Sequence, residues 1–285
     1  MSRVAVVTDS AADLAPETAR AAGIRVVPLS VTFGDASFQA GVDLSNEEFW
    51  SRMTAPGAPF PTTAAASPGA FQTAFEEAFA GGAGGVVYVG ISGSLSATIQ
   101  SAEMARDMLP GRPIFIVDSR SASMAVGVLA LLAAEMAAAA EGDAAQIAAA
   151  VGRRVGDTSF YVALETLEYL RRGGRIGNAT ALIGTLISLK PILTIRDGIV
   201  EPCDRVRTRG RARERVMELL TQRPAERIAI LHAGSPDVEE MRDQVVRRVP
   251  GGIDPARVTI QLIGASIGPH VGPGAYGGVI LYPPG

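Results

Sequence analysis

Residues 84–102, GGVVYVGISGSLSATIQSA, contain the strand, turn and helix that indicate the fold. The glycine pair and the apolar run at 86–89 predict a turn followed by a buried strand, and residues 97–109 have the spacing of a helix. Four serines and one threonine lie within residues 91–102, where the strand passes into the helix. A helix that begins near Ser96 presents free N–H groups and the positive end of its dipole, so this hydroxyl-rich turn indicates a site for an anionic or acyl group.

The same alternation of strand and helix continues on both sides of this unit. Apolar strands are predicted at residues 3–10, 25–33, 86–91 and 113–119, with helices between them and an alanine-rich helix at 126–140 after the last. Asp13 is expected to cap the first of these helices. Strands that are almost continuously apolar predict a parallel sheet covered by helices on both faces. We therefore expect a Rossmann-like α/β domain over residues 1–157.

The pattern changes in the second half of the chain. Asp197-Gly198 between two apolar runs predicts a β-hairpin over residues 192–202. Further strands are expected at 159–164, 227–232, 258–264 and 278–283, with helices at 208–222 and 236–248. A hairpin mixed with helices indicates a mixed-sheet α/β domain over residues 158–285. The apolar segment 181–193 suits either the core or the wall of an apolar slot.

Composition and charge exclude several classes of protein. The net charge of −3 argues against nucleic-acid binding. The only cysteine, Cys203, excludes an intramolecular disulfide and a cysteine-based zinc site, so a cytoplasmic location is expected. No signal peptide is visible at the N-terminus. The most apolar stretch, 126–140, is interrupted by Glu135 and predicts a buried helix, so no stable membrane insertion is expected.

Several catalytic motifs are missing from the sequence. There is no G-x-x-x-x-G-K-[ST] phosphate-binding loop, and the only lysine, Lys190, precedes a proline. No G-x-G-x-x-G follows the first strand, and neither H-E-x-x-H nor a Cys/His cluster occurs. We therefore expect no metal, no cofactor and no ATP site of the chain's own.

Two other functions stay open on the residues alone. GISGS at 90–94 nearly matches the nucleophile elbow G-x-S-x-G and would make Ser92 the nucleophile of a serine hydrolase or esterase, although Ser94 replaces the final glycine. The arginine run at 205–215 is typical of a nucleic-acid binder in isolation, but the acidic residues around it favour a solvated helix face.

Two further loops carry candidate binding residues. FPTTAAASPG at 60–69 holds Thr62 and Thr63 between two prolines, which stiffen the loop. IGPHVGPGAYGG at 267–278 concentrates glycine and proline around His270, one of only two histidines. Either a structural role or a role as donor to an oxyanion fits this histidine.

Together these stretches resemble the DegV family. The matching pieces run in the family's order over essentially the whole chain: VVTDSAADL (6–14), PTTAAASPGAF (61–71), ISGSLSATIQSA (91–102), IVDSRSASMAVG (116–127), LETLEYLRRGGRIG (164–177), LKPILTIRDG (189–198), RVRTRGRA (205–212) and IGPHVGPGAYG (267–277). The resemblance implies a two-domain, non-enzymatic protein that binds one long-chain fatty acid, such as palmitate, in an apolar tunnel. It also implies a partner, the separate ATP-binding subunit of a fatty acid kinase, which phosphorylates the carboxyl group.

The resemblance also implies which residues hold the carboxylate. Thr63 and Ser96 would bind it at the domain interface, with Thr62 and Ser94 as neighbours. Arg207 and His270 match the family's basic residues near the carboxyl end.

The sequence departs from the family's pattern in two places around these residues. Ala97 replaces a glycine, and residues 64–65 are alanines in place of Ser-Gln. Both changes leave the two hydroxyls in place.

Overall fold

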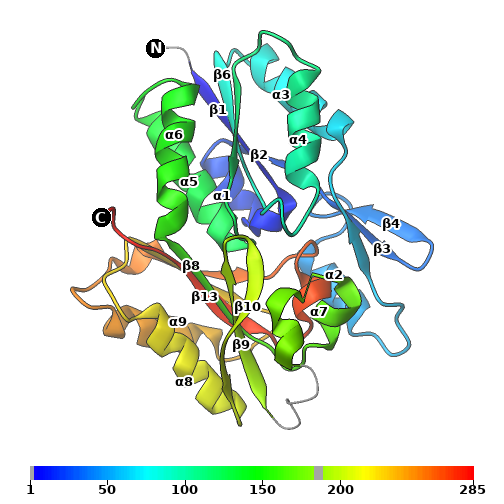
Figure 1. Cartoon of the computed structure of the whole chain (residues 1–285), viewed down its shortest axis with the longest axis vertical. Coiled ribbons are helices and arrows are strands. Elements are labelled where there is room, and N and C mark those ends of the chain that lie inside the picture. Colours follow the sequence, from blue (N-terminus) through cyan, green and yellow to red (C-terminus); the bar gives the residue numbers. More distant parts are fainter. Residues whose placement is uncertain (1–2, 183–188) are drawn as a thin grey trace.

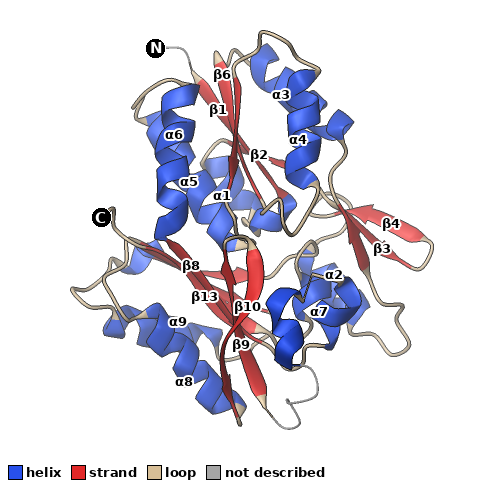
Figure 2. Cartoon of the chain, in the orientation of Figure 1, coloured by secondary structure: helices blue, strands red, loops and turns tan. Residues whose placement is uncertain are grey.

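The structure, a computed structural model, describes residues 3–182 and 189–285. Of the apolar segment 181–193, which suits either the core or the wall of a slot, residues 183–188 lie outside the described part. The fold is mixed α/β and consists of a parallel sheet with its helices and a separate mixed sheet with its own helices (Figure 2).

The first half of the chain forms the parallel sheet that its apolar strands predict. The strand order is β2-β1-β6-β7, with all pairs parallel. These strands are β1 (Val4–Asp9), β2 (Ile24–Val27), β6 (Gly85–Gly90) and β7 (Ile114–Asp118). Helices α3 (Pro68–Ala80) and α4 (Thr98–Asp107) cover one face, and α5 (Met124–Ala138) and α6 (Ala144–Arg154) cover the other (Figure 1). Helix α1 (Pro16–Ala21) packs against β2.

The second half forms a six-stranded mixed sheet in the order β10-β9-β8-β13-β11-β12. Only β11 and β12 pair in parallel. The strands are β8 (Thr158–Ala163), β9 (Lys190–Arg196), β10 (Ile199–Val206), β11 (Arg227–His232), β12 (Val258–Leu262) and β13 (Tyr276–Leu281). Helices α8 (Arg209–Leu220) and α9 (Val238–Arg248) pack on one face of it. The predicted hairpin is β9–β10, and both of its turn residues, Asp197 and Gly198, have positive φ.

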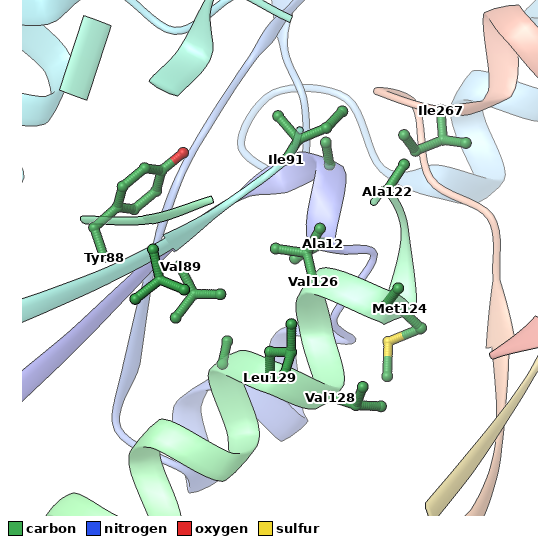
Figure 3. Packing of buried hydrophobic residues seen from close by; sticks show 14 of the residues in the cluster. Ala12, Tyr88, Val89, Ile91, Ala122, Met124, Val126, Val128, Leu129 and Ile267 are labelled. Carbon is green, nitrogen blue, oxygen red and sulfur yellow. The ribbon is translucent and has the colours of Figure 1, made fainter. Parts of the chain in front are cut away.

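Helix α5 lies between the two sheets. It packs on β1 and β6 of the parallel sheet and on β8, β11 and β13 of the mixed sheet. Val126, Val128 and Leu129 are fully buried, and Figure 3 shows Val128 on the side of α5 that is turned away from Val89 of β6. A helix that contacts apolar surfaces on opposite sides must itself be apolar all round, which is why residues 126–140 lack a polar face.

Two expectations about the first forty residues are wrong. Residues 25–33 form two strands, because Pro28 has no N–H to continue the first ladder. After Pro28 the chain turns into β3 (Ser30–Phe33), which joins β4 (Ala36–Gln39) and β5 (Thr62–Ala64) in a small antiparallel sheet. Asp13 does not cap α1. It adopts φ 51°, and Ala15 occupies the N-cap position.

Short elements complete the molecule. Helix α2 (Asn46–Met53) is capped by Ser45, as its sequence predicts. Two short helices, α7 (Glu168–Gly173) and α10 (Gly268–Val271), pack against each other. The 3-10 turns are η1 (Ser10–Ala12), η2 (Val155–Asp157), η3 (Gly177–Leu182) and η4 (Pro255–Arg257).

Candidate functional site

An apolar cavity lies between the two sheets. Its floor comes from the carboxyl ends of the parallel strands, with Ile91 after β6 and Ala122 after β7. The opposite wall is the face of the mixed sheet, including Phe160 and Val162 of β8 and Leu193 of β9. Most lining residues are aliphatic.

Thr63 and His270 meet at this cavity from opposite ends of the chain. The Thr63 Oγ1 lies 3.0 Å from the Nε2 of His270. Thr63 is placed by β5, where it pairs with Val31 of β3, and strand alternation turns it away from the side on which its neighbour Thr62 is exposed. His270 is carried by α10, and both side chains line the cavity.

Ser96 and Arg175 form the next part of the lining. The Ser96 Oγ lies 2.7 Å from the Thr98 Oγ1 at the start of α4. The Arg175 Nε donates to the carbonyl oxygen of Leu95, the residue before Ser96, at 3.2 Å. Ser96 and Arg175 line both the cavity and an adjoining open recess of about 750 Å³. They therefore separate the inner apolar space from solvent.

His270 is neutral at physiological pH. Burial, together with the positive charge of Arg175, lowers the pKa of its imidazole to about 4. Its Nδ1 is buried, and no described residue forms a hydrogen bond with it. The ring faces the backbone of Gly173, where a Cβ would lie 2.3 Å from this nitrogen. His270 therefore presents an uncharged ring to the cavity.

The other sequence-predicted residues lie outside the cavity. Thr62 is exposed, and Ser94 lines only the open recess beside Ser96. Arg207 is exposed just after β10 and does not line the cavity. The structure thus brings Thr63, Ser96 and His270 together and leaves the other three residues around or away from them.

Arg175 is a cavity residue that the sequence pattern does not single out. Basic residues followed by Gly-Gly are a complete helix C-terminal signal, and Gly174 does adopt the left-handed conformation of such a stop at φ 68°. No sequence signal indicates that Arg175, the residue after Gly174, reaches the cavity. Its position becomes clear only from the packing of α7 against α10. Two aspartates at the ends of the parallel strands hold loop backbones instead: Asp9 accepts from the amides of Ala11 and Ile91, and Asp118 accepts from those of Gly93 and Arg120.

The surroundings of Ser92 do not form a nucleophile and base pair. Its Oγ donates to the carbonyl oxygen of Gly198 at 3.2 Å and accepts from the amide of Ser94 at 3.2 Å. Neither histidine forms a hydrogen bond with it among the residues described. The hydrolase alternative therefore lacks the geometry that it requires.

Comparisons with known proteins agree with this arrangement. A family described as uncharacterised protein, DegV family, matches residues 3–283. The chain belongs to the DegV family. A DegV domain-containing protein of Streptomyces coelicolor is 37% identical to this DegV protein over 286 residues, 98% of this chain and 99% of the other. One of Mycobacterium tuberculosis is 36% identical over 280 residues, covering 96% and 95%.

Solved structures of the family have the same fold as this DegV protein. A Thermus thermophilus DegV family protein, described by its fatty acid binding, is 35% identical with a TM-score of 0.88, over 99% of this chain and 100% of that one. DegV of Bacillus subtilis, described as a fatty acid binding protein, is 28% identical with a TM-score of 0.88, over 98% and 99%.

The described part of this DegV protein shows neither a membrane-spanning helix nor a cluster of metal ligands. No described helix combines the length and apolarity needed to cross a bilayer. No group of three or more histidine, cysteine, aspartate or glutamate residues there could hold a metal ion.

Proposed function

We propose that this DegV protein binds one long-chain fatty acid, such as palmitate, in the cavity between its two sheets, without catalysing a reaction itself. The observation that carries the proposal is an apolar cavity that is lined by the hydroxyl-bearing residues Thr63 and Ser96 and that adjoins an open recess at Ser96. Binding of fatty acids by the Thermus thermophilus and Bacillus subtilis relatives supports it.

The apolar lining supplies affinity for the tail. Each methylene transferred from water into such a cavity contributes ~0.8 kcal/mol. Phe160, Val162 and Leu193 are buried by the packing of the sheet against α5, so the wall needs no rearrangement to present an apolar surface. No metal or cofactor is needed for this mode of binding.

Neutral donors suit the carboxylate head. We infer that the hydroxyls of Thr63 and Ser96 donate to it and that the neutral His270 orients Thr63 through the 3.0 Å contact. Each hydrogen bond to a charged group contributes roughly 1.5–3 kcal/mol. Arg175 lies at the mouth and is exposed, so it balances the negative charge without a buried ion pair.

We further propose that this DegV protein is a cytoplasmic carrier that presents the acid to the ATP-binding subunit of a fatty acid kinase. The recess beyond Ser96 supports this role, because a partner that occupies it would reach the carboxylate. The absence of a phosphate-binding loop from the sequence agrees with an ATP site on another chain. We place the domain boundary between residues 157 and 158, where η2 passes into β8.

A comparison of two ligands tests the carboxylate site. Changing Thr63→Val and Ser96→Ala together should weaken binding of palmitate by at least tenfold, because two charge-assisted hydrogen bonds are lost. Binding of hexadecanol should change less, since its head is uncharged. Fluorescent-ligand displacement measures both affinities.

The chain offers a matched control for that comparison. Thr62→Val with Ser94→Ala changes the neighbouring hydroxyls, which lie outside the cavity, and should leave both affinities within about twofold. Equal losses for acid and alcohol in the Thr63 and Ser96 double variant would reject the assignment of these hydroxyls.

A further inference from the structure

Four consecutive residues, 263–266, are each held by a side chain from the first fifty residues of the chain. We call them the docking strip. The hydrogen bonds run from Trp50 Nε1 to the Ile263 carbonyl oxygen (2.7 Å), from the Gly264 amide to Asp13 Oδ1 (2.9 Å), from the Ala265 amide to Asn46 Oδ1 (3.3 Å), and between the hydroxyls of Ser10 and Ser266 (2.8 Å).

The docking strip determines where part of the cavity wall lies. The carbonyl oxygen of Gly264 accepts from the amides of Ile267 and Gly268, so the strip leads directly into α10. Ser266, Ile267 and His270 all line the cavity. A displacement of the strip must therefore move His270 away from Thr63.

Asp13 joins the strip to the rest of the molecule. Its side chain is almost completely buried, and its second oxygen, Oδ2, lies 2.6 Å from the hydroxyl of Ser123, immediately before α5. The residue before Ser123 is Ala122, which lines the cavity. Asp13 and Ser123 both have positive φ, 51° and 56°, a conformation that non-glycine residues seldom adopt without surrounding support. One carboxyl group thus connects η1, α5 and the strip.

No cation balances this carboxyl group among the residues described. Burial is the largest influence on its pKa and raises it, the hydrogen bonds from Ser123 and Gly264 lower it, and the carboxylate of Asp9 raises it; together they give a pKa of about 7. Glu17 of α1 and Glu47 of α2 line the same outer recess, which would add negative charge. Ser123, immediately before α5, is uncharged, and so is Gln261 of β12, which lines the same recess.

The protonated form of Asp13 satisfies both partners. With the carboxyl group ionised, the Ser123 hydroxyl donates to Oδ2; with it protonated this bond reverses, so that the O–H of Asp13 donates to the Ser123 oxygen while its other oxygen still accepts from the Gly264 amide. The ionised form places an unpaired charge in a buried site, and the cost falls when water reaches it. A recess of about 1060 Å³ borders Asp13 and Ala265 on the outer side. Opening of the strip toward this recess would hydrate the charge.

We propose that neutral Asp13 is a positioning residue that keeps the docking strip, and with it His270 and the cavity wall, in place, and that its ionisation favours release of the strip. The consequence for ligand retention rests on the proposed function. The closed state holds the proton more tightly than an open state in which the carboxyl group meets water, so raising the pH favours opening. The opening of the strip therefore increases with pH from the range of an ordinary carboxyl pKa up to about pH 7, and it is constant at higher pH.

Hydrogen exchange of the ligand-free protein tests this directly. After correction for intrinsic exchange rates, the opening constant of amides 264–268 should rise by about tenfold per pH unit between pH 5 and 7 and level off above. In Asp13→Asn the opening constant should not change with pH. The NH2 group of the asparagine can donate to the Ser123 oxygen, and its carbonyl oxygen can accept from the Gly264 amide. A pH-independent constant in the wild-type protein would overturn the proposal without any variant.

Two control variants separate charge from packing. Asn46→Ala should raise the opening constant of the strip by the same factor at every pH, since it removes a neutral contact. Asp143→Asn, at the exposed cap of α6, should leave the wild-type profile unchanged. The same rise with pH in Asp13→Asn as in the wild type would contradict the role of Asp13.

A ligand measurement then tests the link to binding. The release rate of a bound fluorescent fatty acid should follow the pH profile of strip opening in the wild-type protein and should stay constant in Asp13→Asn. A release rate unrelated to strip opening would refute the coupling. Failure to bind any fatty acid would refute the proposed function alone, because exchange in the ligand-free protein still decides the role of Asp13.

Discussion

His270 depends on a glycine that lies about a hundred residues away in the sequence. The backbone of Gly173 touches the imidazole, and a Cβ there would lie 2.3 Å from Nδ1 and 2.9 Å from Cε1. The glycine in this position does more than end a helix, because it makes the space in which His270 can reach Thr63.

Gly173→Ala should therefore displace the ring and break the Thr63 contact. We expect the affinity for palmitate to fall by about tenfold, comparable to the loss of one charge-assisted hydrogen bond. Isothermal titration calorimetry measures the change. Gly152→Ala, in α6 with open space around the position, provides the control and should bind as the wild type does. An unaltered affinity in Gly173→Ala would show that His270 does not orient the site.

At this scale the sequence predicts residue types better than their arrangement. Clustered hydroxyls in a strand-to-helix turn point to Ser96, and the family resemblance adds Thr63 and His270, all of which line the cavity. Arg175 and the hydrogen bonds of Asp13 depend on contacts between residues at least 80 positions apart, which no local pattern encodes. The resemblance names Arg207 instead, and this residue is exposed.

The hairpin β9–β10 connects the two halves of the molecule as well as forming part of the mixed sheet. Its turn residue Gly198 has φ 82°, and its carbonyl oxygen accepts from the Ser92 hydroxyl in the turn after β6. A Cβ on Gly198 would lie 2.4 Å from that hydroxyl oxygen. The hairpin turn therefore requires glycine for its backbone conformation and for its close approach to Ser92.

Gly198→Ala should lower the free energy of unfolding by about 1–3 kcal/mol, since left-handed strain and displacement of Ser92 both contribute. Urea denaturation followed by circular dichroism measures it. Gly210→Ala in α8, where a Cβ meets no other atom within 4 Å, should be neutral or slightly stabilising. If Gly198→Ala lowers the free energy of unfolding no more than Gly210→Ala does, the hairpin turn accommodates the methyl group without cost.

Elements with a strong periodic pattern are predicted well from sequence. The parallel strands, the hairpin and the helices from Arg209 and Val238 onward form close to where their apolar spacing predicts. The small antiparallel sheet is missed because its three strands are short and pair across a gap in sequence. Pro28 is the local signal that divides the expected single strand, but it does not reveal the second sheet.

At the scale of the whole molecule, α5 and the cavity occupy the same interface between the two sheets. Apolar residues on all sides of α5 pack against both sheets, and the space beyond its first turn is bounded by the carboxyl ends of β6 and β7. This agrees with the position of ligand sites in open α/β sheets. The sequence indicates the two halves, but it does not indicate how the mixed sheet closes over this edge.

The most direct test of the account is the lipid content of the purified protein. Organic extraction and mass spectrometry should recover about one long-chain fatty acid per chain from the wild type. Val162→Phe, which fills the cavity from β8, should lose it while circular dichroism shows an intact fold. Absence of any acyl chain from the wild type together with no uptake of added palmitate, or an unchanged lipid content in Val162→Phe, would contradict the assignment of this cavity.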